Sequence, residues 1–470
     1  MTPLAGRELF IQSTYVLASI AFIVGLRGLT QPDKARRGMQ IAAIGMLLAI
    51  IGTLVSAEIL TYKWIALGLG VGAVVGYPLG MWVPMTAMPQ RIAIAQTFGA
   101  LAATLVGVAE YHHAFHGAGA VGLTGFKMAA LGIEVTLGSL TVCGSLIAFG
   151  KLQEVLPSRP LTFKGQNALN LALMAALAGL VIALVMNPAN QALFYILIAL
   201  SGLVGFSLVL PIGGADMPVV IALLNSYAGL ASAATGFALG NMILIICGAL
   251  DGASGFILSL LMSKAMNRSF RSVVFGAFGS DGGTPAAGGT AIAGSVRSIS
   301  VEDAAVQLAY AQRVIVVPGY GMAVAQSQHQ VRELAELVEK NGGEVRYAIH
   351  PVAGRMPGHM NVLLAEANIP YDRLQDMDEI NPDFERTDVV LVIGANDVVN
   401  PAARNDTTSP IYGMPILDAD KAKACIVLKR SMAAGFAGIE NELFYAPNTA
   451  MLFGDAKQSL TKLITEMKAL

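Results

Sequence analysis

Residues 313–324 read RVIVVPGYGMAV, an apolar run that leads directly into a glycine turn. The run at 313–317 predicts a buried strand, and the sequence from 324 to 340 has the pattern of a helix. A strand that ends in a Gly-x-Gly turn before a helix is typical of dinucleotide-binding α/β domains. Such a turn can present backbone N–H groups and a helix N-terminus to a pyrophosphate. The stretch therefore predicts a nucleotide-binding fold near the end of the chain.

More strand and helix patterns alternate after this turn. Further strands are expected at 345–349, 389–393, 424–428 and, less distinctly, 451–453, and further helices at 360–367 and 456–470. This alternation predicts a Rossmann-like, doubly wound parallel sheet.

The first part of the chain has a different composition. Of 470 residues, 55% are hydrophobic and 13% are charged, with mean hydropathy +0.62, whereas a soluble domain usually has roughly twice that charged fraction. Charges are sparse before residue 263, where about nine apolar segments are long enough to cross a membrane. They lie near residues 9–28, 39–57, 64–83, 91–110, 126–150, 167–186, 191–210, 217–238 and 241–263.

These patterns predict three regions. A transmembrane domain covers 1–271, a flexible linker rich in Gly, Ala, Ser and Thr covers 272–300, and a soluble domain covers 301–470. Lys and Arg follow the first, fifth and ninth segments, which predicts an outside N-terminus and a cytoplasmic (or matrix) C-terminal domain. The net charge of −1, without a dense basic cluster, gives no indication of nucleic-acid binding.

Polar residues at membrane depth are costly and therefore informative. Glu134, Asn225 and Asp251 are candidates for a polar pathway, and Asp216 lies at a helix entrance. The histidines at 112, 113 and 116 are expected in an exposed loop between the fourth and fifth segments. The three cysteines are too far apart in sequence to indicate a disulfide framework or a metal site.

Loops at the carboxyl ends of the predicted strands indicate the ligand. Residues 352–358 and 394–397 are small or glycine-rich, and such loops bind ligands in open α/β sheets. The strand at 345–349 is followed by His350, where an acidic residue would grip a ribose 2′-hydroxyl and repel a 2′-phosphate. Lys429, Arg430 and Ser431 follow the fourth strand and suit a phosphate monoester. Together these features favour NADP.

Over essentially its whole length the chain resembles one family, the beta subunit of the proton-translocating NAD(P) transhydrogenase. The resemblance rests on short sequence motifs between residues 213 and 457. They are GGADMPVV at 213–220, LNSY at 224–227, KAMNRSF at 264–270, PGYGMAVAQ at 318–326, HPVAGR at 350–355, GAND at 394–397, KRSM at 429–432 and GDAK at 454–457. The resemblance implies hydride transfer between NADH, held by an alpha subunit, and NADP⁺, held by this chain. Proton passage through the membrane domain is expected to be coupled to this transfer. It also implies a bacterial inner-membrane location and a homodimer of the alpha–beta assembly.

By matching motifs, the resemblance implies a set of NADP(H)-contacting residues and no metal. They are Gly319, Tyr320, Gly321, Ala353, Gly354, Arg355, Met356, Pro357, Gly358, Gly394, Ala395, Asn396, Asp397, Val398, Gly413, Met414, Lys429, Arg430, Ser431, Met432, Ala433, Ala434, Gly435, Phe436, Asp455 and Ala456. Lys429 and Arg430 are expected at the 2′-phosphate, and Gly413–Met414 as a closing segment. Asp397 is expected to be the ionisable group nearest the nicotinamide, and Asn225 and Asp216 to belong to the proton path and its junction with the soluble domain.

One position departs from the family pattern. Many members carry a proton-handling histidine after a Met-Pro motif in the fourth segment, where this chain has Gln96. Glutamine cannot titrate, so the relay is expected to use another group, such as Glu134, or a residue of the partner. The alternative from another class is a channel or transporter regulated by NADP(H) binding. A soluble-type dehydrogenase merely anchored to the membrane would not require about nine spans.

Overall fold

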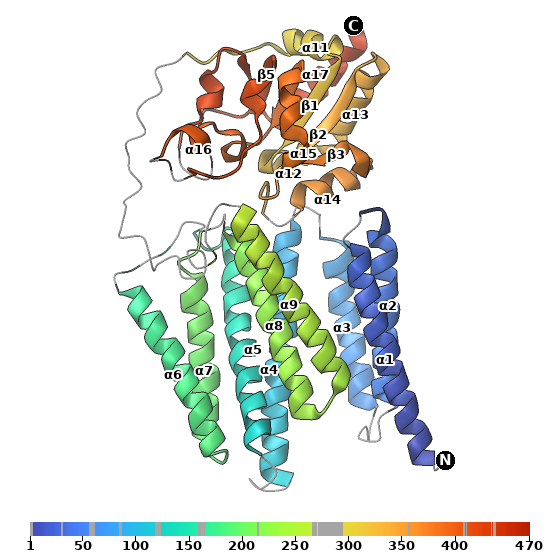
Figure 1. The fold of residues 1–470 in the computed structure, drawn as a ribbon, viewed down its shortest axis with the longest axis vertical. Helices are drawn as coiled ribbons and strands as arrows, with labels where there is room; N and C mark the ends of the chain where they lie inside the picture. The colour runs from blue at the N-terminus through green and yellow to red at the C-terminus, as the bar shows by residue number, and fades with distance from the viewer. Residues whose placement is uncertain are drawn as a thin grey trace. The chain divides into compact units, whose positions relative to one another are not determined.

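The computed structural model describes most of the chain. The described residues are 3–29, 32–55, 62–83, 87–117, 124–157, 161, 163, 165–213, 216–265, 270, 295–355, 358–407, 409, 411–433, 435 and 439–470. Two compact units can be distinguished, a helical unit formed mainly by Met1–Gly214 and Val219–Ser259 and a C-terminal unit formed mainly by Gly279–Leu470 (Figure 1). Each unit is described by itself.

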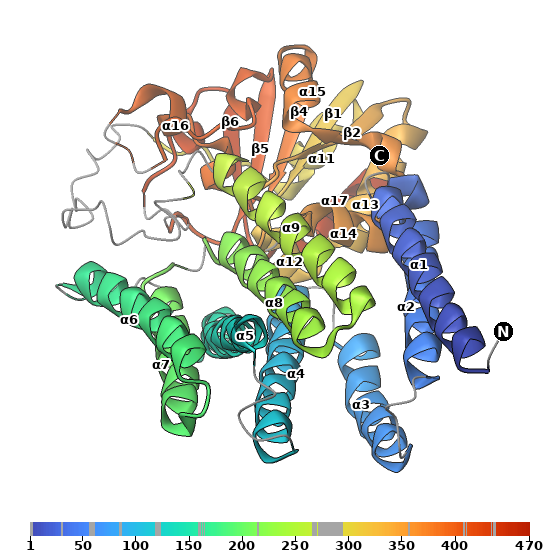
Figure 2. The same ribbon diagram turned by 60° about the horizontal axis from the view of Figure 1, so that its bottom comes forward.

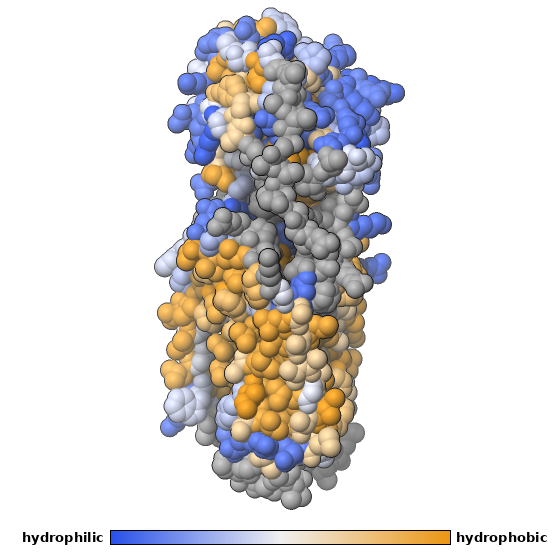
Figure 3. All heavy atoms as spheres, turned by 90° about the vertical axis from the view of Figure 1, so that its left-hand side faces the viewer, coloured by the Kyte–Doolittle hydropathy of each residue, from blue (hydrophilic) through white to orange (hydrophobic). Residues whose placement is uncertain are grey.

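The helical unit consists of long apolar helices. Among the described residues, nine helices are long and apolar enough to cross a membrane. They are α1 (Pro3–Leu29), α2 (Pro32–Leu54), α3 (Lys63–Met81), α4 (Met88–Gly117), α5 (Gly125–Leu152), α6 (Gln166–Met186), α7 (Gln191–Val209), α8 (Met217–Leu239) and α9 (Met242–Ala265). Hydrophobic residues dominate the visible surface of this unit (Figure 3). The chain is a multi-pass membrane protein, and the predicted segments are confirmed.

Glycines allow several of these helices to touch backbone to backbone. A Cβ on Gly205 of α7 would lie 2.1 Å from the carbonyl oxygen of Leu140 in α5. A Cβ on Gly229 of α8 would lie 2.4 Å from the amide nitrogen of Gly252 in α9. Such close contacts favour small residues between membrane helices, where dispersion forces replace the hydrophobic effect.

One sequence-based expectation about the helical unit is wrong. The histidine cluster was expected in a loop, but α4 continues to Gly117 and includes it. The ring of His112 contacts the hydroxyl of Tyr195 on α7.

The C-terminal unit contains one parallel sheet of six described strands. These are β1 (Arg313–Pro318), β2 (Glu344–Ile349), β3 (Leu374–Asp376), β4 (Val389–Ile393), β5 (Ala424–Lys429) and β6 (Thr449–Phe453). Their order is β3-β2-β1-β4-β5-β6, and every adjacent pair is parallel. Figure 2 shows this sheet obliquely, with β6, β5, β4, β1 and β2 in succession. The order is that of a doubly wound Rossmann sheet, as the sequence predicted.

The two faces of the sheet are covered differently. On one side, α11 (Val301–Ala309), α12 (Tyr320–Ala325) and α13 (Gln328–Lys340) pack on α17 (Ala456–Ala469). Side chains of the other face join the buried cluster around Phe384, Leu443 and Phe444. These residues come from short elements, η4 (Asn381–Arg386) and η7 (Glu442–Tyr445). The remaining elements are α14 (His359–Glu366), η3 (Tyr371–Arg373), α15 (Met377–Ile380), η5 (Asp397–Val399), α16 (Ala402–Asn405) and η6 (Ala419–Lys421).

The structure corrects several details of this unit. The helix expected over 324–340 is two helices, because Gln326 adopts a left-handed conformation with φ of 49° and ends α12. Strand β3 and helix α11 were not predicted from the sequence. With three and nine residues, they are too short to produce a distinct periodic pattern. Most of the expected linker lies outside the described residues. Its last part is ordered: Met451 of β6 donates its N–H to Arg297, and the N–H of Ile299 donates to Met451.

We expect Gly205→Ala to destabilise the helical unit by about 1–3 kcal/mol, because its new methyl group forces α7 away from α5. The measurement is the temperature at which the purified protein aggregates in detergent. Gly179→Ala on α6 is the matched control, since a Cβ there meets no described atom within 4 Å. Equal aggregation temperatures for the two variants would contradict the packing described here.

Candidate functional site

The loops after β1 and β4 meet at the centre of the sheet. These strands are neighbours, yet the chain leaves β1 toward β2 on one side and β4 toward β5 on the other. In doubly wound sheets, ligands bind in the crevice at the carboxyl edge beside two neighbouring strands whose connections run in opposite directions. We refer to this region, beside the loops after β1 and β4, as the crevice. All six segments of the expected nucleotide site begin at or near this edge.

Glycines hold the two loops in direct backbone contact. The N–H groups of Gly319 and Gly321 donate to the carbonyl oxygens of Ile393 and Gly394, both at 2.9 Å. A Cβ on Gly319 would lie 2.4 Å from backbone atoms of Gly394 and Ala395, so a side chain cannot be accommodated. The N–H groups of Gly319 and Gly321 therefore already have acceptors within the protein.

The loop after β4 is fixed by a residue that the sequence did not indicate. Asn441 donates from Nδ2 to both the backbone oxygen of Asn396, at 2.9 Å, and its side-chain Oδ1, at 3.0 Å. Asn441 is buried, and its own Oδ1 accepts the N–H of Leu443. No local pattern distinguishes Asn441 from an ordinary turn asparagine, because its partner lies 45 residues earlier in the chain.

Gly435 packs directly against the same loop. A Cβ on Gly435 would lie 2.2 Å from Nδ2 of Asn396 and 2.6 Å from Oδ1 of Asp397. The segment after β5 thus covers the end of the β4 loop, and residue 435 must remain small. Residues far apart in sequence are brought together here.

Two buried donors near the crevice lack an acceptor among the described residues. One is Nδ2 of Asn396, whose Oδ1 is already held by Asn441. The other is Nε2 of His359, a fully buried residue whose Nδ1 accepts the N–H of Arg355 at 3.0 Å. Since Nδ1 acts as the acceptor, the proton of the neutral ring resides on Nε2. Buried donors without partners are rare, so both fit a ligand that brings acceptor atoms.

The loop after β2 contacts the glycine turn through a cation and a ring. The guanidinium of Arg355 lies over the ring of Tyr320, 4.5 Å from its centroid. Gly354, at φ of 108°, approaches His359 so closely that a Cβ would lie 2.5 Å from Nδ1. Gly358, at φ of 65°, caps α14. Met356 and Pro357 lie outside the described residues.

His350 joins this loop to the segment that contains Gly413 and Met414. Its Nε2 donates to the carbonyl oxygen of Pro415 at 2.8 Å, and its Nδ1 accepts the N–H of Val352 at 3.3 Å. Burial lowers the pKa of His350 to about 4, and burial together with the charge of Arg355 lowers the pKa of His359 to about 4. Both rings are therefore neutral near pH 7.

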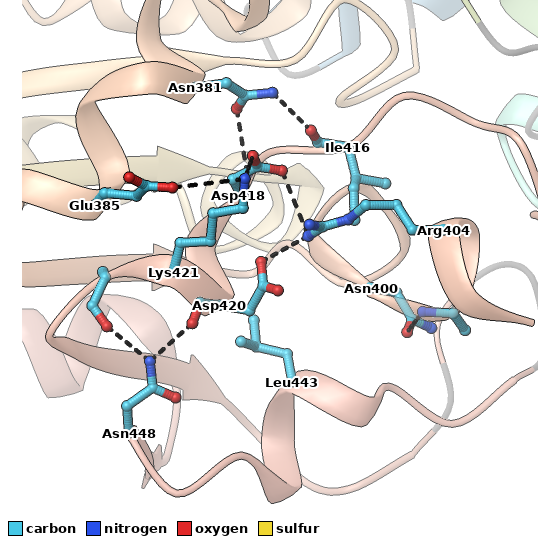
Figure 4. A network of polar contacts seen from close by, with 12 residues as sticks. Asn381, Glu385, Asn400, Arg404, Ile416, Asp418, Asp420, Lys421, Leu443 and Asn448 are labelled. Atoms are coloured by element: carbon cyan, nitrogen blue, oxygen red, sulfur yellow. Dashed lines mark hydrogen bonds and ion pairs between the residues drawn. The ribbon is translucent and has the colours of Figure 1, made fainter.

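The segment after Met414 is anchored by the ion-pair network in Figure 4. Arg404 of α16 reaches Asp420 at 2.6 Å and Asp418 at 3.4 Å, and Lys421 pairs with Asp418 at 2.8 Å. Asn381 donates to the carbonyl oxygen of Ile416 and accepts the N–H of Asp418. Met414 itself packs against the buried cluster of Ala403, Ile411 and Ile416. The backbone beside Gly413 and Met414 is thus well fixed in this structure.

The cations after β5 already have partners within the protein. Lys429 donates from Nζ to the carbonyl oxygen of Ala433 at 2.5 Å and lies over the ring of Phe444. Burial lowers the pKa of Lys429, against the opposing effect of the Asp397 carboxylate. Arg430 is largely exposed and pairs with Asp455 at 3.1 Å, and Asp455 caps the first turn of α17. A phosphate bound here would have to compete with these contacts.

The remaining described residues of the expected set lie in the same region. Val398 and Met432 pack against the buried cluster beneath the crevice. Ser431 accepts the N–H of Ala433 through Oγ, and Ala456 is the first residue of α17. Ala353 is buried and donates its N–H to the carbonyl oxygen of His350. Ala434 and Phe436 lie outside the described residues.

Glu134 is the most deeply buried acid of the helical unit among the described residues. It is 0% exposed, and among the described residues no hydrogen bond to either carboxyl oxygen is found. Gly107 of α4 leaves room for it, since a Cβ there would lie 3.1 Å from the carboxyl carbon. The hydroxyl of Thr235 on α8 lies nearby and donates to its own helix. One turn from Gly107, Glu110 pairs with Lys127 of α5.

Asn225 and Gln96 lie elsewhere in the helical unit. Asn225 donates from Nδ2 to Oδ1 of Asp251 at 2.9 Å, which links α8 to α9. Gln96 donates from Nε2 to the carbonyl oxygen of Ile221 at 3.3 Å. Asp216 directly precedes α8 and is half-buried. The membrane candidates therefore form separate groups, in contrast to the nucleotide candidates around one crevice.

Comparison with known proteins adds independent information. Residues 11–466 match the family model described as NAD(P) transhydrogenase beta subunit. The chain is 50% identical over 457 residues to the NAD(P) transhydrogenase subunit beta of Rhodospirillum rubrum, covering 97% of this chain and 98% of that protein. A relative of the same name from a particular strain of that organism matches with the same figures.

We expect the C-terminal unit to lose stability as pH falls from about 6.5 to 4. In this window an unfolded histidine, with its ordinary pKa near 6.5, binds a proton that folded His350 and His359 exclude. Each histidine then lowers the free energy of unfolding by up to about 1.4 kcal/mol per pH unit. The measurement is amide hydrogen exchange of the β4 peptide in the full chain, corrected for intrinsic exchange. A His350→Gln variant should show a weaker acid dependence, and an unchanged slope would contradict the assignment.

Proposed function

Because the chain belongs to the NAD(P) transhydrogenase beta subunit family, we propose that its C-terminal unit binds NADP(H) and that its helical unit passes protons. Membership makes the chain a subunit of an enzyme that uses nicotinamide nucleotides and works with a partner subunit. The finer proposal is that hydride moves between NADH on an alpha subunit and NADP⁺ on this chain. Proton passage across the membrane is coupled to that transfer.

The observation that carries the nucleotide proposal is the pair of buried donors beside the carboxyl edge of the sheet, where the strand order reverses direction. Nδ2 of Asn396 and Nε2 of His359 lack acceptors among the described residues, and carboxamide or phosphate oxygens of a nucleotide would supply them. Tyr320 and Arg355, stacked at 4.5 Å, form one wall. When bound, the nucleotide supplies the hydride chemistry, and the protein orients it and excludes water.

The residues at the end of β5 favour the phosphorylated nucleotide. Lys429 and Arg430 are adjacent cations at the carboxyl edge, and the strand next to β1 is followed by neutral His350 and not by an acid. A 2′-phosphate would replace the carbonyl of Ala433 as the acceptor for Lys429 and would share Arg430 with Asp455. Gly413 and Met414 would close over the nucleotide. Asp397, beside Lys429, would link its protonation to nucleotide release.

The membrane part of the proposal assigns proton passage to Glu134, Asn225 and Asp216. Glu134 supports this proposal because its carboxyl group is buried and has no hydrogen-bond donor among the described residues. A carboxylate in such a place is costly, so the group is expected to bind a proton there. Asn225 holds a polar contact between α8 and α9. We place the chain in the bacterial inner membrane with its C-terminal unit in the cytoplasm, in a homodimer of alpha–beta assemblies.

The decisive experiment uses membrane vesicles that contain this chain and its alpha subunit. NADPH and an oxidised NAD analogue are added, and analogue reduction and internal pH are followed together. We expect both signals, with proton movement proportional to hydride transfer. Nucleotide binding without hydride transfer would instead favour a channel or transporter regulated by NADP(H).

We expect Lys429→Ala to weaken NADP(H) binding by about 1.5–3 kcal/mol, roughly 10-fold to 150-fold, through lost charge-assisted hydrogen bonds. Equilibrium binding of NADP(H) to the purified chain measures this, and binding of NADH to the alpha subunit should be unchanged. Lys423→Ala is the matched control, because Lys423 pairs with Asp388 before β4 begins, away from the carboxyl edge. Equal losses in both variants, or equal losses for both nucleotides, would argue against a 2′-phosphate site at Lys429.

A further inference from the structure

At the level of Gln96, the hydrogen bond between α4 and α8 joins an amide side chain to a backbone carbonyl, and neither group titrates. Gln96 of α4 donates to the carbonyl oxygen of Ile221, one turn before Asn225 on α8. Amide side chains such as those of Gln96 and Asn225 form hydrogen bonds but cannot take up a proton in the physiological range. A proton that passes Asn225 therefore needs another carrier close to it.

Asp251 of α9 is in direct contact with Asn225. Nδ2 of Asn225 donates to Oδ1 of Asp251 at 2.9 Å, so Oδ2 remains for a proton. Helices α8 and α9 are in close backbone contact next to this pair, because a Cβ on Gly229 would lie 2.4 Å from the amide nitrogen of Gly252. Ser226, next to Asn225, donates to the carbonyl oxygen of Gly252, next to Asp251, at 2.7 Å. The Asn225–Asp251 pair is thus held by close packing on both helices.

The pair lies far from both ends of its helices. Asp251 follows Met242, the first residue of the 24-residue α9, by about 14 Å at a rise of 1.5 Å per residue. Asn225 follows the start of the 23-residue α8 by about 12 Å on the same basis. A carboxylate at this depth is costly unless it is protonated, hydrated or paired.

No described residue neutralises Asp251 with an opposite charge. The other titratable side chains on the two helices are Tyr227, Cys247 and Lys264, and Tyr15 of α1 approaches only the turn between them, at Asn241. Among the described residues, none of these forms an ion pair with Asp251. The side chain is exposed on the surface of this chain, where it would meet lipid, water or a partner subunit.

We propose that Asp251 is a proton carrier of the membrane domain, with Asn225 as the residue that positions it. The proposal rests on the proposed function and deepens it. Oδ2 binds one proton and releases it to the next acceptor, while Asn225 keeps its hydrogen bond to Oδ1 in both states. Gln96 does not contact Asp251 in this proposal. It acts indirectly, because its hydrogen bond to Ile221 fixes the turn of α8 that ends at Asn225. The titratable group absent from α4 is in this way supplied by α9.

The test uses vesicles that contain the full chain and its alpha subunit, with hydride transfer and internal pH recorded together. Asp251→Asn preserves size and one acceptor oxygen but cannot titrate, and we expect at least a 10-fold loss of proton movement. Asp251→Glu keeps a carboxyl group and should retain proton movement with a shifted pH profile. Ser259→Ala is the matched control, since it removes another α9-to-α8 hydrogen bond, to the carbonyl oxygen of Val219, and should behave as the unaltered protein.

The outcomes separate this inference from the proposed function. Absence of coupled hydride and proton transfer in the unaltered assembly would overturn the proposed function itself. Coupled transfer that persists at full rate in Asp251→Asn would overturn the role of Asp251 alone. NADP(H) binding by each variant reports whether the chain has folded.

A chemical probe tests the same group without substitution. A hydrophobic carbodiimide modifies protonated carboxyl groups within membranes, and peptide mass spectrometry locates the adduct. We expect Asp251 to be modified, and the extent of modification to decline as pH rises. Proton movement should fall in proportion to the modified fraction of Asp251. Modification confined to Glu134, with Asp251 unmodified at every pH, would contradict the proposal.

Discussion

The C-terminal unit depends on the backbone contact between the loops after β1 and β4. Gly319 and Gly321 donate to Ile393 and Gly394 at 2.9 Å, and a Cβ on Gly319 would overlap with Ala395. This contact fixes the floor of the crevice, and the loops after β2 and β5 pack around it. The glycines of the turn therefore serve the approach of two protein loops, and the donors that we propose for the ligand come from side chains such as that of Asn396.

A common physical constraint shapes both units: a buried polar group needs a partner or a ligand. In the C-terminal unit, Asn441 satisfies one end of Asn396 and leaves the other end as a donor. In the helical unit, Asn225 bonds to Asp251, whereas Glu134 has no ordinary donor among the described residues. We propose that the Nδ2 group of Asn396, which is unpaired among the described residues, binds the nucleotide, and that the likewise unpaired carboxyl group of Glu134 binds a proton.

Much of the fold followed from local sequence. Apolar segments longer than a bilayer crossing predicted the nine helices among the described residues, and β-branched runs predicted five of the six strands. The errors arose where local patterns are weak or misleading. Strand β3 has three residues, and Gln326 breaks a helix through its backbone conformation.

The sequence by itself determined the family, the division into a membrane part and an α/β part, and the residue types suited to a phosphorylated nucleotide, because these depend on composition, periodicity and motifs. The tertiary structure alone decided which groups meet. Asn441 reaches Asn396 across 45 residues, and Asp251 reaches Asn225 across 26. It also decided that the N–H groups of the glycine turn are already bonded to another loop. Such contacts depend on how distant segments pack, which no local pattern encodes.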